Sequence, residues 1–227
     1  MIHSTLKSCQ AVALPIEKMG TSKMILSTLI FIATFLISGM ALAQSEPCLV
    51  DYALTSSPAD NAGTFEAGET VTFTFEVIEW NQTSSNWFHG AILSFGDGWD
   101  ASSLTTTPAA SCDAVGTWGY YDASTSIGST FGAGFYYEAN GDDDPQNNFG
   151  DNCLGGWVFE FSLTALSDCD ADLSVLVNTT GDYETGGWSS VACEADVDAN
   201  FTATSVCSSV PGCIDQSACN FDSLATE

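Results

Sequence analysis

Residues 71–79 read VTFTFEVIE, and their side chains alternate between apolar and mostly polar along the stretch. Successive side chains of a β-strand point to opposite faces, so a period of two predicts a strand with one buried face. The apolar face is formed by Val71, Phe73, Phe75 and Val77. Such a strand needs a second layer of structure against which this face can pack.

Similar short segments recur along the chain, separated by glycines and short polar links. They predict further strands at 48–54, 88–95, 131–138, 156–164, 172–178, 187–193 and 199–206. No stretch after residue 43 has the apolar period of an amphipathic helix. Many short strands joined by turns predict an all-β fold, an antiparallel β-sandwich of the jelly-roll or immunoglobulin-like type.

The first 43 residues have the pattern of a secretory signal peptide. Lys23 precedes the apolar run 24–37, and the small residues Ala41 and Ala43 follow it. This order predicts cleavage near Ala43, and the run is too short for a stable membrane span. We therefore expect a signal peptide at 1–43, a β-sandwich domain at 44–207, a separate C-terminal segment at 208–227, and a secreted or cell-surface location.

The chain after residue 43 contains no Lys and no Arg, because all three basic residues are lysines of the leader. Of 29 acidic residues only Glu17 lies in the leader, so 28 remain and the formal charge is near −28. Without a cationic side chain, phosphate recognition, nucleic-acid binding and Schiff-base catalysis are excluded. Self-repulsion must then be relieved by bound cations or by salt.

Eight cysteines follow the leader, since only Cys9 of the nine lies in it. An even number in an exported chain predicts disulfide bonds, and zinc is disfavoured because no CxxC pair occurs. The spacing predicts three pairs: Cys169–Cys193 at the open end of a hairpin around Gly181, Cys48–Cys207 at the domain ends, and Cys112–Cys153 by elimination.

The C-terminal segment differs in composition from the rest. Residues 211–227, PGCIDQSACNFDSLATE, carry Gly-Cys-x-Asp followed by Ala-Cys-Asn-Phe-Asp and a further Ala. This pattern resembles a repeat of large multidomain surface proteins of Gram-negative bacteria that use type IX secretion. The closing Asp-rich turn and cysteine of that repeat do not follow, so we expect a truncated repeat within a longer protein.

The central region also resembles unassigned sandwich modules of similar secreted proteins. The resemblance is carried by Asn86–Gly90, Phe95–Asp100, Gly116–Gly119 and Asn148–Asp151. It implies location and architecture but no activity.

His89 is the only histidine after the leader. Strand alternation places it on one face with Trp87, Ala91, Leu93 and Phe95, so we interpret it as a structural histidine. A Ser-His-Asp hydrolase is disfavoured because no GxSxG motif accompanies it. A glycoside hydrolase with a carboxylate pair stays as the alternative, with Asp97, Asp100, Glu138 and Glu160 as candidates.

Residues 140–152, NGDDDPQNNFGDN, concentrate hard oxygen ligands in one loop. Carboxylate and amide oxygens suit Ca²⁺, so Asp142, Asp143, Asp144 and Asp151 are the expected ligands of a calcium ion. The spacing is not that of an EF-hand, and a solvated acidic loop is an equal alternative.

Asp97, Trp99, Asp100 and Trp118 are the expected ligand-binding residues. Both tryptophans neighbour glycines, where an exposed ring can stack on a sugar or a partner. The sequence therefore predicts an exported sandwich module with a non-catalytic binding or adhesion role, for polysaccharide or another surface protein, with calcium as a stabilising cofactor. A glycan hydrolase and a purely structural spacer are the alternatives.

Overall fold

A computed structural model of the chain describes residues 47–82, 86–188, 193 and 198–207. The chain divides into two compact units, 1–44 and 45–227, and all described residues belong to the second. The expected signal peptide and the C-terminal segment with Cys213 and Cys219 lie outside the described residues.

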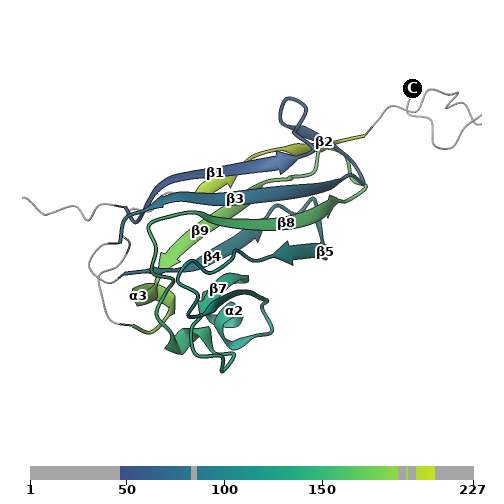
Figure 1. Cartoon of the computed structure of the whole chain (residues 1–227). Helices are drawn as coiled ribbons and strands as arrows, with labels where there is room; N and C mark the ends of the chain where they lie inside the picture. Colours follow the sequence, from purple (N-terminus) through teal and green to yellow (C-terminus); the bar gives the residue numbers. More distant parts are fainter. Residues whose placement is uncertain (1–46, 83–85, 189–192, 194–197, 208–227) are drawn as a thin grey trace, which may run out of the picture. The chain divides into compact units, whose positions relative to one another are not determined.

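Two antiparallel sheets form the all-β sandwich (Figure 1). The four-stranded sheet has the order β1 (Leu49–Ser57), β3 (Thr70–Trp80), β8 (Trp157–Ala165), β5 (Trp99–Thr107). The five-stranded sheet has the order β10 (Ala199–Phe201), β9 (Val175–Gly181), β4 (Phe88–Phe95), β7 (Gly134–Glu138), β6 (Thr117–Tyr121). A short parallel pair joins β2 (Thr64–Glu66) to β11 (Thr204–Val206).

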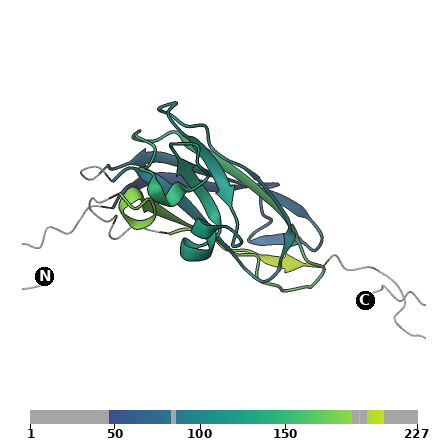
Figure 2. The same ribbon diagram turned by 90° about the horizontal axis from the view of Figure 1, so that it is seen from below.

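Three short helical segments lie on the side of the five-stranded sheet that faces away from the other sheet (Figure 2). They are α2 (Ser126–Phe131), the 3₁₀ helix η1 (Pro145–Asn147) and α3 (Asp182–Thr185). No helix among the described residues is long and apolar enough to cross a membrane.

The alternation that predicts β3 is confirmed. Val71, Phe73, Phe75 and Val77 are fully buried, whereas the side chains between them are only half-buried. β8 pairs with β3 so that Phe161 lies opposite Phe73 and Phe159 opposite Phe75. The rings stack in pairs, with centroids 5.4 Å and 6.3 Å apart. Burying such large apolar faces between the sheets is the main stabilising term of the fold.

The predicted β4 has the expected bounds, but the expected faces are wrong at its start. The register with β9 shifts between Phe88 and Gly90, so the strand contains a β-bulge. The bulge places Phe88 in the interior with Ala91 and Leu93. His89 is buried outside that interior, and a Cβ at Gly90 would lie 2.5 Å from the Thr180 hydroxyl. Only glycine fits this close approach.

Three strands were not predicted, and one predicted hairpin is wrong. The missed strands are β2, β5 and β6. β9 pairs with β4 and β10, so the expected strand at 187–193 is not its partner. The chain after β9 enters α3 instead, Trp188 lies outside any strand, and 189–192 lie outside the described residues.

The six cysteines expected to pair within the domain form three disulfides, and Cys112–Cys153 joins as predicted. The other two pairings are wrong: the bonds are Cys48–Cys193 and Cys169–Cys207. Cys48 immediately precedes β1, and Asn86 donates to the sulfurs of both Cys48 and Cys193. The Asp170 and Ala171 amides donate to Ser205, which brings Cys169 to Cys207. Spatial neighbours, rather than symmetry about Gly181, decide the pairing.

Candidate ligand-binding groove

A groove lies beside the free edge of β6, at the end of the five-stranded sheet. It consists of two adjoining hollows of about 250 Å³ and about 500 Å³. Tyr121, Thr125, Ser126 and Asp143 line both hollows. The remaining lining residues are Gly119, Tyr120, Ile127, Asp144 and Pro145. Aromatic, hydroxyl and carboxylate groups therefore meet in one concavity.

The two tyrosines form the wall that belongs to the sheet. Tyr120 packs edge-on against Phe135, with ring centroids 5.5 Å apart. Tyr121 lies on the opposite face of β6 and packs against Tyr136 at 6.1 Å. β6 is the last strand of its sheet, so no further strand covers these rings, and both remain half-buried.

The second wall is the turn that leads into α2. The Asp122 carboxylate accepts hydrogen bonds from the amide and the hydroxyl of Ser124, at 2.8 Å and 2.5 Å. Thr125 caps the helix, since its hydroxyl accepts from the Gly128 amide at 3.1 Å. A Cβ at Gly128 would lie 2.0 Å from the Asp122 carbonyl oxygen, so glycine is needed for α2 to pack closely against the turn that precedes it.

The third wall is the acidic loop between β7 and η1. Glu138 anchors its start, because one carboxylate oxygen accepts from the Asn140 and Gly141 amides at 2.8 Å and 2.7 Å. Asn148 closes its base by accepting from the Ala139 amide and donating to the Asp144 carbonyl. Side-chain hydrogen bonds therefore hold the loop in place without any basic residue.

His89 supports this loop from beneath. It is fully buried, with Nε2 2.9 Å from the Pro145 carbonyl and Nδ1 2.7 Å from the Thr185 hydroxyl. Because a carbonyl only accepts, Nε2 carries the proton. Burial lowers the pKa of His89 to about 4, so the ring is neutral near pH 7. These contacts agree with a structural histidine.

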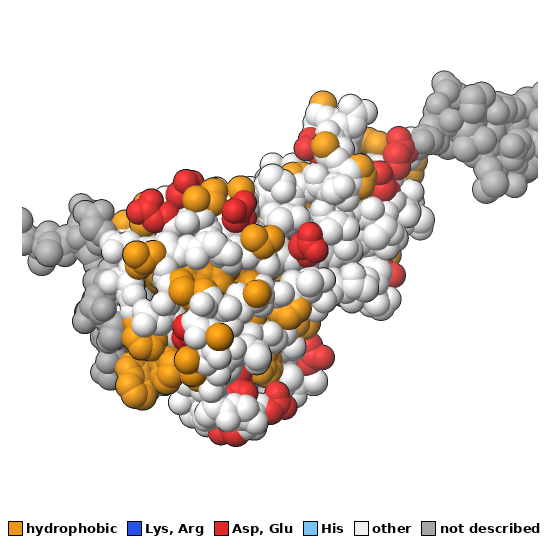
Figure 3. All heavy atoms as spheres, viewed as in Figure 1, with side chains coloured by type: hydrophobic (Ala, Val, Ile, Leu, Met, Phe, Trp, Pro, Cys, Tyr) orange, Lys and Arg blue, Asp and Glu red, His pale blue; other side chains and the backbone are white. Residues whose placement is uncertain are grey.

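The groove is strongly acidic. Figure 3 shows acidic side chains gathered at the bottom of the view, in the region of α2 in Figure 1, and no Lys or Arg on this face. Burial, together with the charges of Asp143 and Glu138, raises the pKa of Tyr121 to about 12. Its phenol therefore stays neutral and presents a hydroxyl and a ring face.

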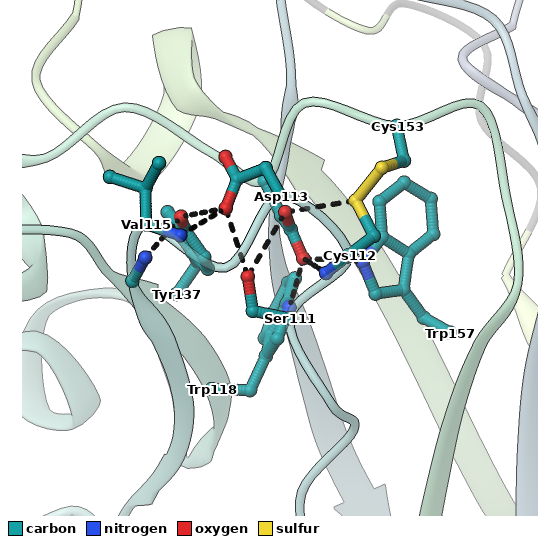
Figure 4. The surroundings of a disulfide bond; sticks show 10 residues. Ser111, Cys112, Asp113, Val115, Trp118, Tyr137, Cys153 and Trp157 are labelled. Carbon is teal, nitrogen blue, oxygen red and sulfur yellow. Dashed lines mark hydrogen bonds between the residues drawn. A yellow bond between two sulfur atoms is a disulfide. The ribbon is translucent and has the colours of Figure 1, made fainter.

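Asp151, one of the four expected calcium ligands, belongs to a different cluster, beside the Cys112–Cys153 disulfide. Figure 4 shows this disulfide with Trp118 and Trp157 near it. It is fully buried and accepts from the Trp157 and Trp118 indoles at 2.7 Å and 3.0 Å. The Cys112 amide donates to the same oxygen at 3.1 Å. Asp151 thus joins two core tryptophans to the Cys112–Cys153 disulfide, and the expectation that it faces Asp142, Asp143 and Asp144 is wrong.

The other three expected ligands are exposed on the loop. Asp142 accepts from the Asp144 amide and from Asn147, and Asp144 accepts from the Gln146 amide. The hydrogen bond from Asn147 is the largest influence that lowers the pKa of Asp142. Within the described residues, the only cluster with metal-ligand spacing is Cys112, Asp151 and Cys153, whose two sulfurs are joined to each other.

The expected rim site at Asp97, Trp99, Asp100 and Trp118 does not form. Trp99 is only 4% exposed, its indole donates to the Ser174 carbonyl, and its ring packs against Phe73. Trp118 is only 5% exposed and packs against Phe88. Both rings are interior because the sandwich closes over them, which leaves neither free to stack on a ligand.

Two of the four candidate carboxylates of a glycosidase, Glu138 and Glu160, lie in different sheets. Glu138 is buried in the five-stranded sheet and anchors the loop, whereas Glu160 is exposed on the four-stranded sheet. The Asp100 carboxylate accepts from the amide and hydroxyl of Ser102, and these bonds lower its pKa. Asp97 is exposed on the turn before β5.

Tyr120 and Tyr121 are the groove residues that the sequence did not single out. Their signal was two adjacent aromatics followed by Asp-Ala-Ser-Thr, a strand that ends in a turn and a helix cap.

No protein-family model matches the sequence, and no curated protein matches it. Among solved structures, the chain is similar to a cohesin module from the family 33 glycoside hydrolase of Clostridium perfringens, with a TM-score of 0.33 and 9% sequence identity. The alignment covers 70% of this chain and 97% of that chain. The residues of the groove therefore carry the functional inference.

Proposed function

We propose that this chain is an exported, non-catalytic β-sandwich module that binds polysaccharide in the groove beside β6. The supporting observation is the lining of that groove, where Tyr120 and Tyr121 lie next to the hydroxyls of Thr125 and Ser126 and the carboxylate of Asp143. Sugars offer apolar ring faces and many hydroxyls. Aromatic rings pack on the faces, while hydroxyl and carboxylate oxygens bond the hydroxyls.

The groove has preformed walls. Its walls are fixed by the cap of α2 and by the Glu138 and Asn148 hydrogen bonds, so little ordering is needed when a ligand enters. Three disulfides hold the domain and suit an extracellular location.

The test uses residues 45–227, which form one compact unit, on a polysaccharide array and then in calorimetric titration with the best ligand. Tyr121→Ala is expected to weaken binding about tenfold, the effect of one lost aromatic contact. Tyr183→Ala is the matched control, because Tyr183 is 48% exposed on α3, away from the groove lining. If every polysaccharide fails to bind, the module is a structural spacer.

We also propose that divalent cations stabilise the acidic loop. Asp142, Asp143 and Asp144 are consecutive and exposed, and the chain after residue 43 offers no Lys or Arg to offset their charge. The midpoint of thermal unfolding is expected to be higher in CaCl₂ than in NaCl of matched ionic strength, and EDTA is expected to remove the difference. Equal midpoints in the two salts would mean that salt acts only by screening the charges of the loop, without specific binding of a divalent cation.

A further inference from the structure

The groove has a charge that its ligand must complement. Asp143 and Asp144 line it, and Asp122 and Asp142 are exposed beside it. No Lys or Arg exists after residue 43 to balance these carboxylates. His89, the one histidine of that part, is buried and neutral beneath the loop. When no divalent cation is bound, an anionic sugar would therefore meet repulsion here without any partner, whereas a cationic group would meet partners.

Asp143 is the carboxylate best placed to meet such a group. Asp142 and Asp144 already accept hydrogen bonds from their own loop. Asp143 lines both hollows, and it is close enough to Tyr121 to raise the pKa of that phenol. An ionised carboxylate has about four acceptor positions that a ligand can use.

Tyrosine rings add a second attraction for cations. A cation over an aromatic face is attracted by the ring quadrupole. Tyr120 and Tyr121 border the same hollow as Asp143. The groove thus combines tyrosine rings with a carboxylate that no basic side chain balances.

Resting on the polysaccharide-binding function above, we propose that the groove selects glycans with free, protonated amino groups over N-acetylated, neutral and acidic glycans. The sugar face packs on a tyrosine, and its ammonium group pairs with Asp143. The ligand thereby supplies the positive charge that the protein lacks.

The test compares glucosamine and N-acetylglucosamine oligomers of equal length, with oligogalacturonate as the acidic probe, by calorimetric titration in a mildly acidic, low-salt buffer. We expect the amine oligomer to bind about tenfold more tightly than its acetylated form, from one ion pair and one cation–π contact. Added salt is expected to reduce the difference. Oligogalacturonate is expected not to bind.

Asp143→Asn is expected to remove most of the amine preference while leaving the weaker binding of the acetylated oligomer intact. Asp51→Asn is the matched control: it also removes one exposed negative charge, but from β1, outside the groove. The control should bind both oligomers as the unaltered protein does. Equal loss of preference in both variants would mean that overall charge, not the groove, attracts the amine, and would overturn the proposal.

Two further outcomes separate this inference from the function on which it rests. If another polysaccharide binds in a Tyr121-dependent manner while the amine gives no advantage, the amine selectivity is wrong and the glycan-binding function stands. If hexalysine binds as tightly as the amine oligomer and is equally weakened by Asp143→Asn, the groove recognises basic peptides, and the assignment to a glycan is overturned.

Discussion

The space between the two sheets and the layer outside the five-stranded sheet bury side chains of different kinds. The interior contains mainly aromatic and aliphatic groups, such as Phe73, Phe159 and Trp157. The outer layer, made of His89, Tyr136, Asn148, Thr180, Asp182 and Thr185, is as deeply buried but mostly polar. Apolar packing depends on volume, whereas every buried polar group needs a partner. Substitutions in the two layers should therefore destabilise the domain differently, by creating cavities in the interior and by leaving buried polar groups without partners in the outer layer.

Within the outer layer, most buried polar groups have hydrogen-bond partners. His89 bonds to Thr185 and Pro145, Thr180 lies 3.0 Å from Thr185, and Asn148 ties the acidic loop. Asp182 is the exception, because neither carboxylate oxygen has a hydrogen-bond partner. The polar layer thus holds both the support of the groove and the least satisfied group described.

The largest effect is expected in the interior. Phe73→Ala removes a ring that packs against Phe161 and Trp99, and the lost burial and the cavity should cost about 4 kcal/mol of unfolding free energy. Urea denaturation measures this cost. Thr74→Ala, on the other face of the same strand, should change stability by no more than about 0.5 kcal/mol. Similar costs at both positions would contradict the assignment of faces.

An intermediate effect is expected for the pair of His89 and Thr185. His89→Ala leaves a cavity and removes one hydrogen bond of the Thr185 hydroxyl, which keeps its contacts with Thr180 and Gly181. It should cost about 3 kcal/mol, and Thr185→Val should cost about 1–2 kcal/mol. The double variant should cost less than the sum by about 1 kcal/mol, since both changes remove one shared bond. Strict additivity in urea denaturation would show that the two side chains are not coupled.

The smallest effect concerns Asp182 and depends on pH. Burial, with a further contribution from the charge of Glu184, raises the pKa of Asp182 to about 7, against about 3.9 in an unfolded chain. Between these values the folded state holds the extra proton, so the contribution of Asp182 to stability falls as pH rises. His89 acts in the opposite sense: its folded pKa of about 4 lies below the unfolded value of about 6.5, so its contribution falls as pH decreases.

The two groups therefore offset each other between about pH 5 and 6.5 in the unaltered protein. Asp182→Asn removes one of the two opposing contributions, so the pH dependence that His89 causes should become visible. The free energy of unfolding should then increase with pH across this range, by at most about 1.4 kcal/mol per pH unit. At pH 8 the variant should be more stable by about 1–2 kcal/mol, because no buried charge remains. Urea denaturation at several pH values measures both effects. A profile parallel to that of the unaltered protein would show that Asp182 is solvated.

The contrast between the apolar interior and the polar outer layer also explains which parts of the fold could be predicted from the sequence. β3 and β8 were predictable because burial of one whole face imposes a visible period of two. β5, WDASSLTTT, was missed because an edge strand rich in Ser and Thr carries no apolar alternation. The faces of β4 were wrong because a bulge at His89 leaves no signal in the side-chain pattern.

The groove was harder to predict because its parts are brought together only by tertiary structure. Asp143 was identified as a loop carboxylate, yet its neighbours Tyr121 and Thr125 lie about 20 residues away in the chain. Trp99 and Trp118 looked like binding residues because they adjoin glycines, but both rings are buried, and Gly98 lies against the backbone of Asp172. The sequence alone does not show which aromatic residues lie at the uncovered edge of a sheet.

The disulfide connectivity gives the domain a defined response to tension. Force applied to the segments flanking Cys48 and Cys207 passes through the Cys48–Cys193 bond and then along only the 14 residues from 193 to 207. That path can lengthen to about 50 Å at most, whereas an uncrosslinked chain from 48 to 207 could reach about 500 Å. β10 and β11 lie on the loaded path, and the strands that carry the groove do not. A module held at both ends would thus keep the proposed binding groove folded under load.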